Sequence, residues 1–180
     1  MIYKNIDIKN CKDISEKVYD YVANKTNIFK GVHNVWNNLD IKDVLSYVPE
    51  LGESFREIGD IIPQQITIFK VAPQGTITIH TDGGRNSRLL WPIKNCEGSY
   101  TKFFKIDPSN IETIINKEHN SSYGHIKNPE LVELIHSVEL TQPIVFKPWV
   151  PHGIWTNPTI KEPRLTLTVF FDKTLDFLLV

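Results

Sequence analysis

The sequence predicts a mainly β fold with flanking helices, and two observations carry this prediction. Beyond residue 63, several segments are rich in β-branched and aromatic residues, alternate apolar with polar side chains, and are separated by Pro, Gly and Asn. Segments whose apolar residues recur at helical intervals of three or four are found mainly in residues 1–60. A series of short strands is typical of a two-sheet sandwich or a jelly roll. We therefore expect a jelly-roll core with helices packed against it.

Residues 1–60 are expected to form a helical support. Apolar residues recur at helical intervals in two segments, so helices are expected over residues 13–24 and 40–48. Asp13 or Ser15 offers an N-cap for the first helix. Pro49 and the two glycines that follow it, Gly52 and Gly59, then break the helical pattern ahead of the sheet.

The β-helix core is expected to span residues 64–172. Strands are expected over residues 65–71, 76–80, 88–93, 100–106, 143–146 and 165–171. A turn through Pro73-Gln74-Gly75 joins the first two of these strands. Around residues 107–138 we expect an insertion that covers a pocket in the interior of the core. It is expected to be helical over residues 108–117 and an exposed loop over residues 120–128.

Length, charge and cysteine content limit the classes of protein that fit. The 180 residues suit a single domain, 1–180. A net charge of -1 and a pI near 6.6 make nucleic acid an improbable partner, because that partner requires clustered Lys and Arg. Cys11 and Cys96 fit no zinc spacing and favour a reduced cytoplasmic protein. The first twelve residues are polar and contain no membrane span, so we expect no membrane association.

The triplet His80-Thr81-Asp82 is the first candidate for chemistry. Alternate side chains of a strand share a face, so His80 and Asp82 are expected to point the same way. The same alternation places Thr76 and Thr78 with them, as a polar interior, and the intervening isoleucines on the other face. Two glycines follow the triplet, so the strand ends where it can open onto a cavity. The alternative is a polar surface pair at a strand end.

His152 is the best candidate for a third metal ligand. It lies between Pro151 and Gly153 and follows Lys147-Pro148-Trp149-Val150, a stiff aromatic segment that would hold an imidazole in place. The other histidines have no such surroundings, although a capped turn histidine is an alternative for His152 itself. Two His and one carboxylate on one side of a metal are expected of non-haem Fe(II) oxygenases, since this arrangement leaves coordination positions open.

Arg164 and Thr166 form a second candidate pair, on one face of the last predicted strand. A guanidinium matches a carboxylate through two parallel hydrogen bonds, and a neighbouring hydroxyl donates another. The pair therefore suits a dicarboxylate ligand. The alternative is a structural salt bridge of Arg164 with Glu162 or Asp172.

Taken in order, His80-x-Asp82, His152 and Arg164-x-Thr166 resemble the Fe(II)/2-oxoglutarate-dependent dioxygenase superfamily. The resemblance covers residues 64–172, and residues 1–60 match no motif. The segment Arg85-Asn-Ser-Arg88-Leu-Leu-Trp-Pro-Ile is similar to the aspartyl/asparaginyl β-hydroxylase-like branch. That branch often lacks the carboxylate ligand, whereas this chain has Asp82.

The resemblance implies a double-stranded β-helix core, of the jelly-roll or cupin-like type, and a hydroxylase. It implies that His80, Asp82 and His152 hold Fe(II) and are the catalytic residues. It further implies that Arg164 and Thr166 bind the cosubstrate 2-oxoglutarate, with Arg88 as a further candidate for that contact. Succinate and CO2 are the expected coproducts, and Asp in place of Gly at position 82 implies hydroxylation over halogenation.

The substrate expected from the resemblance is a small molecule or a protein side chain. Two alternatives to the enzyme stay open at this point. One is a cupin-like protein that binds a metal or a small carboxylate without oxidation, and the other is a noncatalytic β-sandwich interaction module.

Overall fold

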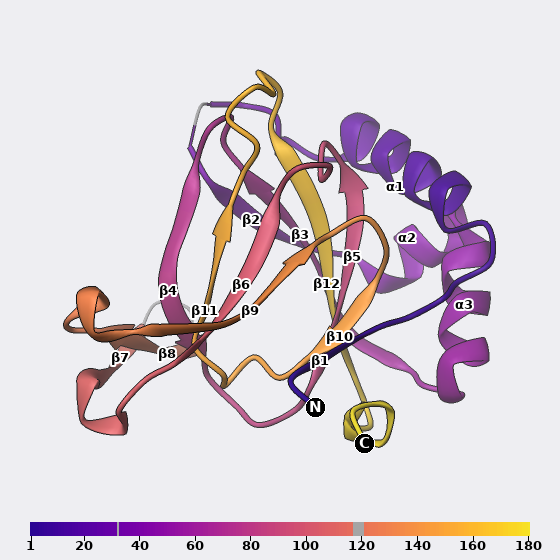
Figure 1. Ribbon diagram of the computed structural model, residues 1–180. Helices are drawn as coiled ribbons and strands as arrows, with labels where there is room; N and C mark the ends of the chain where they lie inside the picture. The colour runs from indigo at the N-terminus through magenta and orange to yellow at the C-terminus, as the bar shows by residue number, and fades with distance from the viewer. Residues whose placement is uncertain (32, 117–120) are drawn as a thin grey trace.

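Two antiparallel sheets face each other, and helices cover the outer face of one of them (Figure 1). The computed structural model describes residues 1–31, 33–116 and 121–180. Within these residues, twelve strands form two six-stranded sheets. The predicted mainly β jelly-roll fold with flanking helices is therefore confirmed.

The sheet next to the helices, here the helix-backed sheet, contains most of the expected strands. In spatial order its strands are β1 (Tyr3–Asn5), β10 (Ile144–Phe146), β5 (Arg88–Lys94), β12 (Arg164–Phe171), β3 (Pro63–Val71) and β2 (Val35–Leu39). The second sheet consists of β7 (Ile111–Asn116), β8 (Ser121–Ile126), β4 (Thr76–Asp82), β11 (His152–Trp155), β6 (Tyr100–Lys105) and β9 (Glu133–Glu139). Strands β3 and β4 follow one another through the expected turn, but they belong to different sheets.

The helices α1 (Cys11–Lys25) and α2 (Ile41–Tyr47) confirm the two expected helices. Asp40 caps α2 by accepting a hydrogen bond from the Asp43 backbone N–H at 2.9 Å. The N-cap of α1 is Asn10 and not Asp13 or Ser15, which lie inside the helix. No helix of the described residues is long and apolar enough to cross a membrane.

A third helix, α3 (Pro49–Gly59), occupies the segment where the sequence pattern suggested a break. Proline is tolerated in the first turn, because the N–H it lacks has no partner within the helix there. Leu51 and Phe55 lie on one face of α3 and are fully buried, so packing compensates for the glycines.

The insertion is built from strands, which corrects the helix expected over residues 108–117 and the loop expected over 120–128. Pro108–Asn110 forms one short 3₁₀ turn, and β7 and β8 follow as an antiparallel pair. A second 3₁₀ turn, Pro129–Leu131, precedes β9. Residues 117 and 120 of the expected segments lie outside the described residues. The isoleucines at 111, 114 and 115 have helical spacing, but the pairing of β7 with β8, and of β8 with β4, makes this segment a strand.

Gly124 shows why β8 can approach β4 so closely. It lies opposite Thr81, and a Cβ atom at this position would collide with the Thr81 side chain. A glycine that suggests a loop from sequence therefore serves close strand packing here.

Two apolar clusters define the faces of the helix-backed sheet. Leu165, Leu167 and Val169 of β12 belong to the larger cluster, which joins this sheet to the helices. Because strand side chains alternate, the residues between them, Thr166 and Thr168, face the second sheet. The smaller cluster includes Leu90, Phe103 and Phe146 and fills part of the space between the sheets.

A buried serine connects α1 to the helix-backed sheet. Trp91, which has no exposed surface, donates from Nε1 to Ser15 Oγ at 2.9 Å. Ser15 Oγ itself lies 2.8 Å from the Pro92 carbonyl oxygen and 2.9 Å from that of Cys11, to either of which it can donate its proton.

We expect Ser15→Ala to lower the free energy of unfolding by about 2 kcal/mol, because the indole N–H would lose its acceptor in a buried place. Ser54→Ala is the matched control, since the hydroxyl of buried Ser54 donates to the Glu50 carbonyl of its own helix at 2.9 Å and makes no other side-chain hydrogen bond among the described residues. Its expected change is within about 0.5 kcal/mol. Urea unfolding of both variants measures the difference, and equal losses would contradict this role of Ser15.

Candidate metal centre

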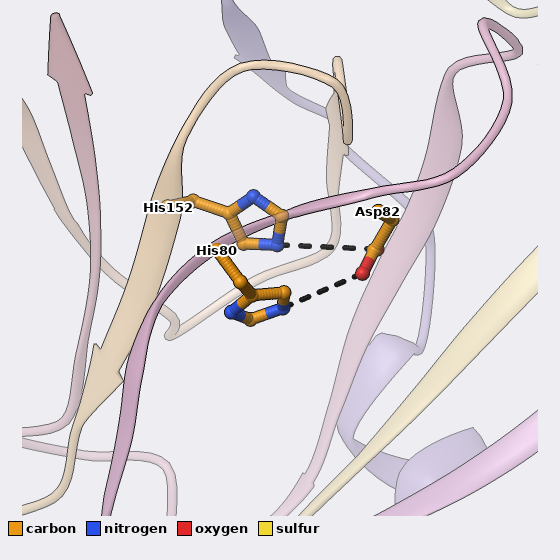
Figure 2. A group of neighbouring side chains, drawn as sticks. All are labelled: His80, Asp82 and His152. Carbon is orange, nitrogen blue, oxygen red and sulfur yellow. Dashed lines mark ion pairs between the residues drawn. The ribbon is translucent and has the colours of Figure 1, made fainter. Parts of the chain in front are cut away.

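His80 and Asp82 of β4 and His152 of β11 lie close together and point toward one another (Figure 2). His80 Nε2 lies 3.4 Å from Asp82 Oδ1, and His152 Nε2 lies 3.9 Å from Asp82 Oδ2. One ligand atom from each of the three residues lies within 4.8 Å of the others. In the described part of the chain, this is the one group of three or more His, Cys, Asp and Glu residues with such spacing.

The pairing of β4 with β11 brings the two imidazoles together. His80 lies directly opposite His152, and their ring centroids are 4.6 Å apart. Directly opposite residues of an antiparallel pair project on the same side of the sheet. The two histidines, distant in sequence, therefore share one side because of this register.

A β-bulge in β4 sets the direction of His80. His152 pairs with His80, but two residues further along β11 Ile154 pairs with Ile77, so β4 contains one extra residue between these pairs. Ile77 therefore lies on the His80 side of the sheet. This corrects the expectation of a strictly alternating strand with Thr76, Thr78 and His80 on one face.

Both imidazoles are held through Nδ1. His80 Nδ1 lies 2.8 Å from the Thr78 carbonyl oxygen, and His152 Nδ1 lies 2.8 Å from the Val150 carbonyl oxygen. A carbonyl oxygen only accepts, so each Nδ1 carries a proton, and in the neutral imidazole Nε2 is then the nitrogen that keeps its lone pair. Metal-binding histidines are commonly oriented by such a bond from the second ring nitrogen.

The charges of the three residues also suit a metal. Burial lowers the pKa of His152 to about 4, so this side chain is neutral at pH 7. Burial by itself would raise the pKa of Asp82, but the hydrogen bond to His80 and the positive charges nearby hold it well below its usual range. For His80, burial opposes a raised pKa, yet the hydrogen bond and charge of Asp82 outweigh it and raise the pKa.

These donors fit a first-row metal ion. Ligand atoms lie about 2.1 Å from such an ion, so two of them are separated by at most about 4.2 Å. Asp82 Oδ1 lies 3.4 Å from His80 Nε2 and Asp82 Oδ2 lies 3.9 Å from His152 Nε2, so each imidazole has an oxygen of this carboxylate within that distance. Two neutral nitrogens and one anionic oxygen form the set typical of non-haem iron sites with open positions.

Arg88 lies at this centre. Its Nη1 donates to Asp82 Oδ2 at 2.5 Å, and its Nη2 donates to the Gly83 carbonyl oxygen at 3.1 Å. Its guanidinium also lies over the ring of Phe170, 3.9 Å from the centroid. The sequence made Arg88 a candidate contact for a cosubstrate, whereas its contacts in the structure are with the candidate metal ligand.

Arg164 and Thr166 lie deep between the sheets. The buried Cys96 thiol is near enough to the Arg164 guanidinium for the two groups to affect each other's pKa, but no carboxylate of the described residues pairs with this guanidinium. Arg164 is 1% exposed, and its Nε, Nη1 and Nη2 have no hydrogen-bond partner among the described residues. The hydroxyls of Thr166 and Thr101, both also buried, have none either. The alternative salt bridge of Arg164 with Glu162 or Asp172 does not form. Thr101, on β6, carried no sequence signal, since its orphaned hydroxyl exists only in the folded protein.

The fold is similar to that of several oxygenases of known structure. A Pseudomonas putida prolyl-4-hydroxylase matches with 13% identity and a TM-score of 0.50, covering 95% of this chain and 91% of that one. A viral collagen prolyl hydroxylase from Paramecium bursaria Chlorella virus-1, solved with 2OG, matches with 12% identity and a TM-score of 0.54, covering 95% and 96%. A non-haem alpha-ketoglutarate-dependent carbocyclase from nogalamycin biosynthesis matches with 9% identity and a TM-score of 0.56, covering 94% and 78%.

No protein-family model and no curated protein sequence matches the chain. At 9 to 13% identity, the structural likeness shows the fold alone. The chain thus has a double-stranded β-helix core like that of these oxygenases. Its function has to be inferred from the residues of the candidate metal centre.

We expect the affinity of the centre for Mn²⁺ or Co²⁺ to be highest above the raised pKa of His80 and to fall as the pH drops through it. The ion must displace the His80 proton there, which weakens binding up to about 10-fold per pH unit. His152 and Asp82 stay deprotonated down to lower pH because their pKa values are lowered. Competition against a chromophoric chelator between pH 5 and 8 measures the profile, and an affinity constant across this range would contradict it.

Proposed function

We propose that this protein is an Fe(II)- and 2-oxoglutarate-dependent oxygenase that hydroxylates an organic substrate and releases succinate and CO2. One observation carries the proposal. The interior of a double-stranded β-helix core contains a His-Asp-His group with metal spacing and also a fully buried arginine that has no carboxylate partner among the described residues. A metal ion would complete the His-Asp-His group, and a dicarboxylate that chelates this ion would give the arginine a carboxylate partner.

In this proposal His80, Asp82 and His152 hold the iron, and bound iron supplies the activation of oxygen. The protein's own contribution is positional. The carbonyls of Thr78 and Val150 orient both rings and fix the tautomer of the neutral imidazoles, so that Nε2 is the atom that binds the metal. Phe103 and Phe146 pack against His152, with ring centroids 6.2 Å and 5.3 Å away, and exclude water from that side of the centre.

Arg164 is the proposed partner of the distal carboxylate of 2-oxoglutarate. Burying a guanidinium without acceptors is costly, so its retention indicates a ligand that completes it. Thr166 lies two residues along the same face of β12, and its orphaned hydroxyl can donate to the same carboxylate. The face of β12 that bears Arg164 also bears Phe170, which lies beneath Arg88 beside Asp82. One strand thus connects the two parts of the proposed site.

The proposal extends to hydroxylation of a small molecule or a protein side chain by a cytoplasmic protein that folds as one domain over residues 1–180. Assignment to the aspartyl/asparaginyl β-hydroxylase-like branch stays a prediction based on the segment from Arg85 to Ile93. The short 3₁₀ turns and strands of residues 107–138 adjoin the centre through the pairing of β8 with β4, so we assign them to the substrate side.

We expect oxygen-dependent formation of succinate from 2-oxoglutarate in the presence of Fe(II) and ascorbate. His80→Ala and Asp82→Ala should each lower this rate at least about 100-fold, because each removes a metal ligand. His136→Ala, at an exposed position of β9, is the matched control and should leave the rate unchanged. Mass spectrometry of candidate substrates for an added oxygen atom then identifies the product.

The same assay separates the proposal from its alternative. Uptake of metal and 2-oxoglutarate without succinate formation would favour a cupin-like binding protein. Absence of both metal uptake and turnover in the wild-type protein would favour a noncatalytic module.

We expect Arg164→Lys to weaken 2-oxoglutarate binding about 10- to 100-fold, since lysine keeps the charge but loses the fork. Arg164→Met should abolish this binding and yet raise the Tm of the protein without ligand, because it removes a buried cation that no carboxylate of the described residues neutralises. Thermal unfolding with and without 2-oxoglutarate and Mn²⁺ measures both effects. A lower Tm for the Met variant, together with unchanged 2-oxoglutarate affinity for the Lys variant, would assign Arg164 a structural role.

A further inference from the structure

Arg88 links the two sheets at the metal centre. It begins β5 in the helix-backed sheet, yet its guanidinium contacts Asp82 and Gly83 at the end of β4 in the second sheet. The side chains of Arg88 and Asp82 are 13% and 25% exposed, so the ion pair is largely shielded from water. The ring of Phe170 lies 3.9 Å below the guanidinium carbon and fixes the plane of the fork.

These contacts divide the two oxygens of Asp82 between different partners. Oδ2 accepts the 2.5 Å hydrogen bond from Arg88 Nη1 and lies 3.9 Å from His152 Nε2, whereas Oδ1 lies 3.4 Å from His80 Nε2 and has no contact with Arg88 among the described hydrogen bonds. A charge-assisted hydrogen bond on one oxygen fixes the rotation of a carboxylate about its Cβ–Cγ bond. Asp82 therefore has a defined orientation in the structure before any metal binds.

We propose that Arg88 is a positioning residue that makes Asp82 offer a single oxygen, Oδ1, to the metal. This inference rests on the proposed function. A carboxylate that binds through one oxygen takes one coordination position, and a bidentate carboxylate takes two. By holding Oδ2, Arg88 keeps one more position free for the chelating cosubstrate. The role differs from direct contact with 2-oxoglutarate, which the sequence suggested for this residue.

The identity of the residue supports this role. Lysine provides one point charge, but the planar fork of arginine bonds Asp82 and Gly83 together and stacks on Phe170. The Nη1 and Nη2 atoms that face the centre already have acceptors, and the remaining Nε is buried without a partner. Arg88 is thus oriented toward the metal ligand.

Cobalt(II) provides a test with a readout besides activity, because its visible absorption depends on its coordination number and geometry. We would compare the full-length wild-type protein with Arg88→Gln, Arg88→Lys and the matched control Arg56→Gln, which removes an exposed arginine from α3. Thermal unfolding first establishes that each variant is folded. Co²⁺ spectra are then recorded before and after titration with 2-oxoglutarate.

We expect Arg88→Gln to bind Co²⁺ with a changed spectrum already before 2-oxoglutarate is added, and to bind 2-oxoglutarate at least about 10-fold more weakly. The Co²⁺ spectrum and the 2-oxoglutarate affinity of Arg88→Lys should lie between those of Arg88→Gln and the wild type. Those of Arg56→Gln should equal the wild type. If Arg88→Gln does not fold, the same two measurements on Arg88→Lys and the wild type test the role of Arg88.

Two outcomes would overturn the inference while leaving the proposed function intact. A weaker affinity for 2-oxoglutarate with an unchanged cobalt spectrum would show direct contact of Arg88 with the cosubstrate. An unchanged spectrum and an unchanged affinity would show a purely structural ion pair. By contrast, a wild-type protein that takes up no Co²⁺ would overturn the proposed function and this inference with it.

Discussion

The register between β4 and β11 is the constraint on which the rest of the centre depends. It places His80 opposite His152, and the extra residue in β4 turns the His80 ring to the side of its partner. A shift of this register by one residue would move the imidazoles to opposite faces of the sheet. The bulge places the two rings on one side of the sheet. The bonds from both Nδ1 atoms to backbone carbonyls fix the tautomers of the neutral rings.

The interior between the sheets is only partly apolar, which has a physical cost. Leu90, Phe103 and Phe146 fill one part of it, but the guanidinium of Arg164 and two threonine hydroxyls lie there without a hydrogen-bond partner in the described part of the chain. Such groups destabilise a protein unless a ligand completes their hydrogen bonds. On the face of the helix-backed sheet that contacts the helices, Leu165 and Val169 of β12 are buried in the larger apolar cluster and stabilise the fold. The two faces of one strand thus serve stability and chemistry separately.

The candidate site was more predictable from sequence than the insertion next to it. His80 and Asp82 follow a strongly β-branched segment, and glycines mark its end, so local pattern alone indicated a pair of donors at a strand terminus. The isoleucines at 111, 114 and 115 have helical spacing, and the pairing partner in β8 that makes this segment a strand is not visible in the local pattern. The helix α3 was missed for a related reason, since the burial of Leu51 and Phe55 outweighs the helix-breaking residues around them.

The sequence by itself determined the kinds of donor available, two imidazoles and a carboxylate, and an arginine and a threonine on one strand face, because residue type and strand period are local properties. Only the tertiary structure decided which oxygen of Asp82 pairs with Arg88, that Ile77 shares the side of His80, and that Arg164 is buried without an acceptor. These facts depend on strand register and on packing between the two sheets, and both result from contacts between segments far apart in the chain.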